Sequence, residues 1–291
     1  MSMRGLTVFI ADIRNCRVRE MEEKRINKEM ANIRSKFKEG RLDGYSKKKY
    51  VCKLLYMYIL GWEIDFGHME AVNLISSPKY SEKQIGYLAV TLLFHENSDL
   101  VRLVVNSIKK DLDNMNEINQ CLALHAIANI GGREMAESLA TDVHRLLISP
   151  TSKSFVQKKA ALTLLRLYRK HADVIPAQEW AERIIALMSS YDLGVGLSVT
   201  TLVMALAQNY PNEYFGCYEK AILVDRDYSL EYIYYKIPTP WLQVKLLRLL
   251  QYYPPTEDPH LFQELTDLLQ HIIANSQDTP KNIQHNNAQN A

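Results

Sequence analysis

The sequence predicts an all-α protein, and three features indicate it. Nearly all-apolar segments that end in a polar, Gly or Pro stop recur with starts about 37, 38, 38 and 46 residues apart, at Gln84, Cys121, Lys159, Leu197 and Gln243. Amphipathic segments alternate with them, at residues 100–112, 135–148, 180–189 and 214–224. Glycine is sparse, and alternating apolar and polar residues bounded by turn dipeptides are not found. Paired helices with a period near 40 are typical of HEAT and armadillo repeats, so we expect a right-handed α-α superhelix, a solenoid of stacked helix pairs.

The elements before the repeats are predicted from apolar spacing and from breaks. Residues 4–12 form a short lead-in, and a long polar helix over about 14–38 carries an apolar stripe of Met21, Ile26, Met30 and Ile33. Gly40 and the Asp43-Gly44 pair end that helix. The next helix is predicted from Ser46 to Gly61, and a short one follows over 69–75.

The end of the chain differs from the repeats. The longer fourth interval contains residues 225–240, where we expect a loop or a short extra helix. Residues 1–275 are predicted to be helical repeats. Residues 276–291 form a polar tail, either a loop or the truncated start of another repeat. Because a solenoid normally ends in a polar capping repeat, the missing cap predicts that the sequence comes from a longer protein.

The most informative stretch for function is the start of the helix after Gly44. Ser46 is predicted to cap this helix with its hydroxyl, which places Lys47, Lys48 and Lys49 in the first turn. Cations are unfavourable there, because the helix dipole already makes that end positive. A bound phosphate would satisfy both the amides and the lysines, so the turn is predicted to bind phosphate. A solvated lysine run on a surface helix is the alternative.

The charge around this turn is strongly asymmetric. From Lys24 to Lys53 we count about 11 Lys and Arg against about 3 acids, or about +8. The whole chain carries +2, so the rest is near −6. Such a concentration of cations favours association with an anionic surface.

Other classes of protein are disfavoured by what the sequence lacks. Gly131-Gly132 is not followed by the Lys-Ser/Thr of a phosphate loop, and neither a His-Glu-x-x-His pair nor a Cys-x-x-Cys pair occurs. We therefore expect no enzyme activity, no metal and no cofactor. No run of about 18 apolar residues could span a bilayer, and no signal peptide is found. Four widely spaced cysteines indicate free thiols in a reducing compartment, so the chain is predicted to be cytosolic.

The sequence also resembles a known family over its whole length. The long stretches that begin at Asp43, Ile64, Lys83 and Pro240 resemble the amino-terminal trunk of the large adaptin subunits. The lysine triplet and the segment Phe66-Gly67-His68-Met69-Glu70 look like those of alpha-adaptins, from the endocytic clathrin adaptor complex of the plasma membrane. The gamma-adaptins of Golgi and endosomal coats are the nearest alternative and lack the triplet.

The resemblance implies a set of sites and partners. In the family this trunk binds the headgroup of phosphatidylinositol 4,5-bisphosphate on the inner plasma membrane. The matching positions here are Arg4, Lys36, Tyr45, Lys47, Lys48, Lys49 and Lys53. Arg14 matches a position that helps to receive the acidic residue of dileucine sorting signals. The resemblance also implies small sigma, beta-type and mu partner subunits and a peripheral location at clathrin-coated pits. The loop over residues 38–42 looks slightly shorter than in the animal proteins.

Two further functions are consistent with a basic helical solenoid. A HEAT or armadillo scaffold that binds only protein would bind no headgroup and would tolerate reversal of the three lysines. A helical repeat that binds nucleic acid would show a steep salt dependence and stacking aromatic residues among the lysines. Only Tyr45 and Tyr50 are available for such stacking, so the protein scaffold is the stronger of these two alternatives.

Overall fold

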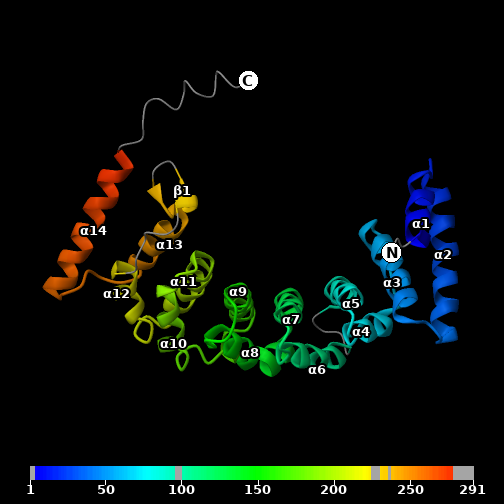
Figure 1. Ribbon diagram of the computed structural model, residues 1–291, viewed down its shortest axis with the longest axis horizontal. Coiled ribbons are helices and arrows are strands. Elements are labelled where there is room, and N and C mark those ends of the chain that lie inside the picture. The colour runs from blue at the N-terminus through cyan, green and yellow to red at the C-terminus, as the bar shows by residue number, and fades with distance from the viewer. Residues whose placement is uncertain (1–3, 96–99, 224–229, 235–236, 278–291) are drawn as a thin grey trace, which may run out of the picture. The chain divides into compact units, whose positions relative to one another are not determined.

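The computed structural model describes residues 4–95, 100–223, 230–234 and 237–277, and most of them are helical (Figure 1). In chain order the α-helices are α1 (Arg4–Arg14), α2 (Arg19–Glu39), α3 (Gly44–Ile59), α4 (His68–Ile75), α5 (Tyr80–Leu93), α6 (Val101–Leu112), α7 (Glu117–Ile130), α8 (Arg133–Ile148), α9 (Ser154–Lys170), α10 (Ala181–Ala186), α11 (Leu193–Ala207), α12 (Gly216–Leu223), α13 (Pro240–Leu250) and α14 (Pro259–Gln277). The remaining elements are the 3-10 helices η1 (Ala172–Val174), η2 (Leu187–Ser189) and η3 (Leu230–Tyr232) and the strands β1 (Ile233–Tyr234) and β2 (Ile237–Pro238).

Each segment that the apolar spacing marks as a helix is a helix, so the prediction of an all-α helical repeat is confirmed. Several helices start earlier than their apolar segments, for example α7 at Glu117 and α9 at Ser154. The reason is that polar side chains near their starts, such as Gln120 in α7 and Gln157 to Lys159 in α9, interrupt the apolar spacing. The boundary predicted at residue 275 falls inside α14, and residues 278–291 lie outside the described residues.

The chain divides into two compact units, which are described separately. The first comprises Met1–Val143 and Lys170–Val174, and the second comprises His144–Arg169 and Ile175–Ala291. The lysine-rich turn belongs to the first unit, and the inserted segment before α13 belongs to the second. Each unit therefore has its own core and its own exposed surfaces.

In the first unit, α1, α2 and α3 share an apolar core. Phe9, Ile26, Val51 and Met57 are fully buried there. Farther along, α4 and α5 approach closely at Gly86, where an added Cβ would lie 2.6 Å from the backbone nitrogen of Ile75. Only glycine permits this approach, so Gly86 sets the contact between α4 and α5.

A buried ion pair links α5 to α6 in the same unit. The Lys83 ammonium lies 2.7 Å from Asp111 Oδ2, donates to the Ile75 carbonyl at 2.5 Å, and is 8% exposed. The Tyr87 hydroxyl donates to the same Asp111 oxygen at 2.6 Å. Burial raises the pKa of Tyr87, and the Asp111 charge raises it further. The carboxylate is thus satisfied on both sides, as a buried charge requires.

The second unit is built around α11, which is almost wholly apolar. Val195, Val199, Leu202 and Val203 of α11 are fully buried. Beyond it, Tyr218 lies edge-on to Tyr253 with ring centroids 5.9 Å apart. Burial raises the pKa of the nearby Cys217 thiol to about 11. All four cysteines are free, Cys217 being buried and the other three half-buried.

The inserted segment before α13 contains a strand pair that the sequence did not predict. Strands β1 and β2 are antiparallel, with Ile233 opposite Pro238 and Tyr234 opposite Ile237. Thr239 then adopts φ +41°, and its amide donates to the Tyr232 carbonyl at 3.0 Å. Two residues in each strand are too few for an alternating pattern to show in the sequence.

Two predictions for the amino-terminal segment are wrong. Residues 4–12 are not a lead-in but most of helix α1, whose Phe9 and Ile13 lie one turn apart and are buried. The long polar helix begins at Arg19 rather than near Arg14. Its end is as expected, since Gly40 adopts the left-handed conformation and caps α2.

A candidate phosphate-binding site

The start of α3 is capped by Asp43, not by Ser46. Asp43 precedes the first helical residue, and its Oδ1 accepts from the Ser46 amide at 2.9 Å. Hydrogen bonds from Ser46 lower the pKa of the Asp43 carboxyl, and the charge of Lys79 lowers it further. The prediction of Ser46 as the cap is wrong, because aspartate is itself a preferred cap and Asp43 directly precedes the helix. The three lysines therefore lie in the second turn of α3.

A second carboxylate lies beside the same helix end. A Cβ built on Gly44 would collide with the Glu82 carboxylate, which is nearly buried. Glu82 accepts from the Ser77 hydroxyl at 2.7 Å. The positive end of the α3 dipole is thus already compensated by Asp43 and Glu82. A ligand at this site would be held by lysine side chains rather than by the helix terminus.

The three lysines remain without acidic partners. Lys47, Lys48 and Lys49 are half-buried, and across the described residues none of them pairs with a carboxylate. The Lys48 ammonium lies 3.2 Å from the Ser81 hydroxyl and 5.6 Å from the Tyr45 ring. The Lys49 ammonium lies 4.6 Å from the centre of the Tyr50 ring. Three adjacent cations without a carboxylate partner in the described residues favour an anionic ligand.

Helices α1 and α2 bring two more predicted cations towards the triplet. Gly5 of α1 lies next to Lys49, since an added Cβ would be 3.5 Å from Lys49 Cδ, and exposed Arg4 is its neighbour. Phe37 of α2 meets Tyr50 of α3 edge-on at 6.2 Å, which carries the end of α2 to the first turns of α3. We call Arg4, Lys36, Tyr45, Lys47, Lys48 and Lys49 the basic face.

Lys36 already has a partner within its own helix. Its ammonium lies 3.0 Å from Glu39 Oε1, and the two side chains are 40% and 54% exposed. An exposed pair of this kind is worth only about 0–1 kcal/mol. Lys36 can therefore exchange Glu39 for an incoming phosphate at little cost.

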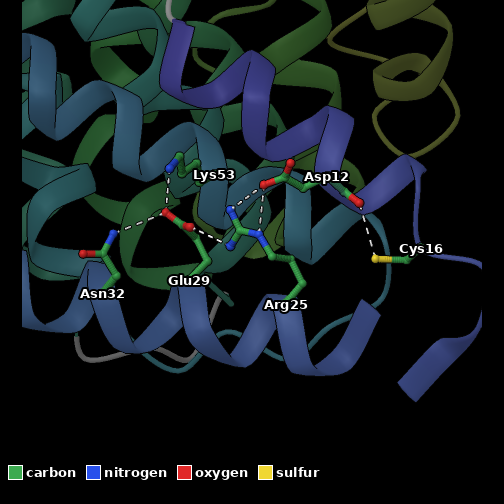
Figure 2. Close-up of polar contacts among 6 residues, drawn as sticks. All are labelled: Asp12, Cys16, Arg25, Glu29, Asn32 and Lys53. Carbon is green, nitrogen blue, oxygen red and sulfur yellow. Dashed lines mark hydrogen bonds and ion pairs between the residues drawn. The ribbon is translucent and has the colours of Figure 1, made fainter. Parts of the chain in front are cut away.

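Lys53 is placed differently from the other predicted ligands. Its side chain is 8% exposed and its ammonium lies 2.5 Å from Glu29 Oε1 (Figure 2). Glu29 also accepts from Arg25 at 2.8 Å, and Arg25 pairs with Asp12 at 3.0 Å (Figure 2). This burial argues against a direct headgroup contact by Lys53. In a lysine-rich stretch of sequence, nothing distinguishes the buried Lys53 from the lysines at the surface.

These four side chains, Asp12, Arg25, Glu29 and Lys53, form an ion network that joins α1, α2 and α3 (Figure 2). Burial alone would raise the pKa of Glu29, but hydrogen bonds and charges from Lys53 and Arg25 outweigh it and lower the pKa. Glu29 thus stays ionised at neutral pH. The network holds the three helices that carry the basic face, so Lys53 positions that face instead of touching the ligand.

Arg14 is exposed at the opposite end of α1 from Arg4. Ten residues of helix separate the two, or about 15 Å along the axis. The loop after Arg14 contributes to a pocket of about 370 Å³ whose lining includes Arg17, Arg19 and Trp62. Arg14 thus lies at the other end of α1 from the basic face.

Neither a cluster of metal ligands nor a membrane-spanning helix is found in the described ranges. They contain no group of three or more His, Cys, Asp or Glu that could hold a metal ion. Among the same residues, no helix is both long and apolar enough to cross a membrane.

Comparison with known proteins gives a consistent set of relatives. The family model described as "Adaptin N terminal region" matches residues 22–288. "AP-2 complex subunit alpha-1" of Arabidopsis thaliana is 49% identical over 99% of this chain and 29% of its own length. "AP-2 complex subunit alpha" of Schizosaccharomyces pombe is 45% identical over 100% of this chain and 33% of its own. "AP-1 complex subunit gamma-1" of Mycosarcoma maydis is 32% identical over 96% of this chain and 32% of its own length.

One solved structure supports the fold. A chain of "Homology model of the full-length AP-3 complex in an intermediate open conformation" superposes with a TM-score of 0.59 at 20% identity. The match covers 80% of this chain and 38% of that one. At this identity the likeness shows a shared helical solenoid and nothing finer.

Proposed function

The chain belongs to the adaptin family, and from this premise we propose that it forms the amino-terminal trunk of an alpha-type subunit in clathrin-mediated endocytosis and intracellular protein transport. Its 45–49% identity to AP-2 alpha subunits, against 32% to an AP-1 gamma subunit, supports the alpha type. The chain spans about a third of these relatives' length, for example 33% of the Schizosaccharomyces protein. Clathrin and accessory-protein binding by the remaining two thirds are therefore not assigned to it.

The ligand that we propose for the basic face is the headgroup of phosphatidylinositol 4,5-bisphosphate on the inner plasma membrane. The observation that carries this proposal is the absence of any acidic partner for Lys47, Lys48 and Lys49 within the described residues. Phosphates would neutralise these ammonium groups, with Arg4 and Lys36 contributing from α1 and α2. The Tyr45 hydroxyl would add a donor. Lys53, predicted as a direct ligand, is proposed to act through the ion network.

The expected affinity is low. A cation close to an anionic membrane is worth about 1 kcal/mol, so the five cations of the basic face contribute about 5 kcal/mol. This corresponds to a dissociation constant on the order of 0.1 mM. A second contact, from cargo or from another subunit, would be needed for firm attachment. Such weakness suits a protein that must leave the membrane again.

Further partners follow from the same family assignment. We propose that small sigma, beta-type and mu subunits assemble on this trunk, and that the assembly locates to clathrin-coated pits. Arg14 would receive the acidic residue of dileucine signals, whose leucines bind the small subunit. Its exposure and its distance from the basic face support a separate role for it.

Liposome co-sedimentation of the whole 291-residue chain tests the headgroup proposal. We expect pelleting that requires phosphatidylinositol 4,5-bisphosphate and that Lys47→Glu/Lys48→Glu/Lys49→Glu abolishes. The matched control is Lys110→Glu/Lys153→Glu/Arg183→Glu, which makes the same change in net charge at exposed positions elsewhere. Equal pelleting of the two variants would contradict the proposal. If pelleting of the unchanged chain did not depend on phosphatidylinositol 4,5-bisphosphate, the protein-only scaffold would be favoured.

The role of Arg14 needs its own measurement. With the small subunit co-expressed, an acidic dileucine peptide should bind the Arg14→Ser variant about tenfold more weakly, because a charged hydrogen bond is lost. The same peptide with its acid replaced by glutamine should lose most of this difference. An unchanged affinity for the acidic peptide would contradict the assignment.

A further inference from the structure

Helix α9 exposes a single stripe that changes character along its length. Leu162, Arg166 and Arg169 are exposed at spacings of three and four residues, which places them on one side of the helix. Leu162 is 48% exposed, and Phe155, two turns earlier, is 43% exposed. Lys159, also exposed, lies between Phe155 and Leu162 on the same side, so the stripe mixes apolar and basic residues at first and ends in cations.

Helix α13 also ends in cations, and its exposed amino end is apolar. Trp241 and Val244 are 57% and 49% exposed, and Lys245 and Arg248 follow one turn later on the same side. The apolar end continues onto the neighbouring strand, because the Tyr234 ring lies 5.7 Å from the Trp241 ring between centroids. Both helices therefore end in exposed cations, and the amino end of α13 adds a continuous exposed apolar patch.

Helix α11 lies between these two and carries no charged residue (Figure 1). Hydrogen bonds hold the three carboxyl ends together. Asn209 Nδ2 donates to the Tyr168 hydroxyl at 2.6 Å, and Gln208 Nε2 donates to the Tyr252 hydroxyl at 2.9 Å. The two stripes are thus held as the two edges of one surface, which we call the α9–α13 face.

The cations of this face gather without acidic partners. Burial lowers the pKa of Lys245, and the charges of Arg248 and Arg169 lower it further. In the described part of the chain, no carboxylate pairs with Arg166, Arg169, Lys245 or Arg248. Cations in the last turn of a helix do suit its dipole, which accounts for Arg169 and Arg248. That explanation does not cover Lys245, and it does not explain why large apolar side chains are exposed beside the cations.

We propose that the α9–α13 face docks a segment of a partner polypeptide that presents apolar side chains at one end and carboxylates at the other. The complementarity of charge sets the orientation, because the carboxylates must lie over Arg169, Lys245 and Arg248. The apolar end would cover Trp241, Val244 and Leu162. An exposed tryptophan is typical of a protein interface. A phosphate ligand would use the cations but would leave these apolar side chains in water. This inference does not depend on headgroup binding.

The probe is a fluorescein-labelled peptide of about four helical turns, with leucines in its first half and glutamates in its second half. Anisotropy titration against the whole chain should show saturable binding. Replacing the glutamates by glutamines should weaken it about tenfold, since the charged pairs are then lost. Equal affinity of the two peptides, or no binding by either, would overturn the proposal.

A charge swap makes the test specific to this face. Arg169→Glu/Arg248→Glu changes two exposed residues, and it should abolish binding of the glutamate peptide and create binding of a lysine peptide. Lys110→Glu/Lys153→Glu, with the same change in net charge, should bind as the unchanged chain does. Circular dichroism should show that all variants are folded. If instead only inositol hexakisphosphate binding responds to Arg169→Glu/Arg248→Glu, the face is a phosphate site and the proposal is wrong.

Discussion

Apart from Lys36, the cations of the basic face and of the α9–α13 face have no acidic partners among the described residues, but the neighbours of the two faces differ. In the basic face, the lysines lie beside Tyr45, Tyr50 and Ser81, which are polar or partly polar. In the α9–α13 face, the cations adjoin exposed Trp241 and Val244. A surface that offers mainly charge suits a ligand that is mainly charge and must be released. A surface that adds apolar area suits a polypeptide.

The two faces also differ in what holds them. Helices α1, α2 and α3 are joined by a nearly buried ion network around Glu29. The α9–α13 face is supported by the apolar helix α11 and by neutral hydrogen bonds such as Asn209 to Tyr168. Charged networks are expensive to break, because removal of one member leaves its partners buried and unpaired.

The largest effect is expected for Glu29→Ala. This change leaves the buried Lys53 ammonium without its partner, and we expect it to lower the free energy of unfolding by about 3 kcal/mol. Asn209→Ala, which removes one neutral hydrogen bond from the other face, should cost about 1 kcal/mol. Urea denaturation followed by circular dichroism measures both. Equal losses would show that the two faces are supported alike. Glu39→Gln, at the exposed pair with Lys36, is the control and should change little.

Salt should separate the two faces next. The screening length falls from about 30 Å at 0.01 M to about 3 Å at 1 M salt. Headgroup binding by the basic face should therefore weaken about tenfold or more between about 0.05 and 0.5 M salt. Peptide binding to the α9–α13 face should weaken less, because its apolar contacts are not screened. Titration of both ligands over one salt series measures this, and equal slopes would remove the distinction between the faces.

A smaller effect is expected from pH. Glu29 has a lowered pKa in the folded protein, so its contribution to stability is fully present above its ordinary value of 4.5 and is lost as pH falls through the lower folded value. The difference in urea midpoint between the unchanged chain and Glu29→Gln should be constant near neutral pH and should shrink below about pH 4.5. A difference that persists at the lowest pH would show that the carboxylate charge is not what stabilises the network.

The smallest effect concerns the cap of α3. Asp43→Ala should lower the urea midpoint more than Ser46→Ala does, because Asp43 accepts from a terminal amide whereas the Ser46 hydroxyl only supports Asp43. Asp43→Asn should keep the cap and remove a negative charge near the lysines, so headgroup pelleting should increase several-fold. If Ser46→Ala were the more damaging change, the hydroxyl would be the cap after all.

The fold could be predicted well because buried helices leave a strong periodic pattern. The segments beginning at Cys121 and Lys159 were recognised as helices from apolar residues alone. Their first turns were missed, as was the helix α1, whose buried side chains Phe9 and Ile13 are few. The β1–β2 pair was missed as well. Short elements have too few residues for a period to be seen.

The candidate site was predicted in part. The lysine triplet is visible as a charge run, and no carboxylate among the described residues pairs with it. Lys53 looks the same in the sequence, yet it points among α1, α2 and α3 towards Glu29, which lies 24 positions earlier. The compensation of the helix end by Glu82 likewise comes from α5. Such contacts join segments that no local pattern connects.

The sequence by itself determined that the chain is a helical repeat of the adaptin family with an excess of cations near its amino terminus. Helix spacing and charge runs are local properties, so they can be read directly along the chain. The tertiary structure decided which cations face outward and which are neutralised inside, and it joined the stripes of α9 and α13 into one surface. The physical reason is that the burial of a charge and its partner depends on which helices pack together, and packing brings together residues far apart in the chain.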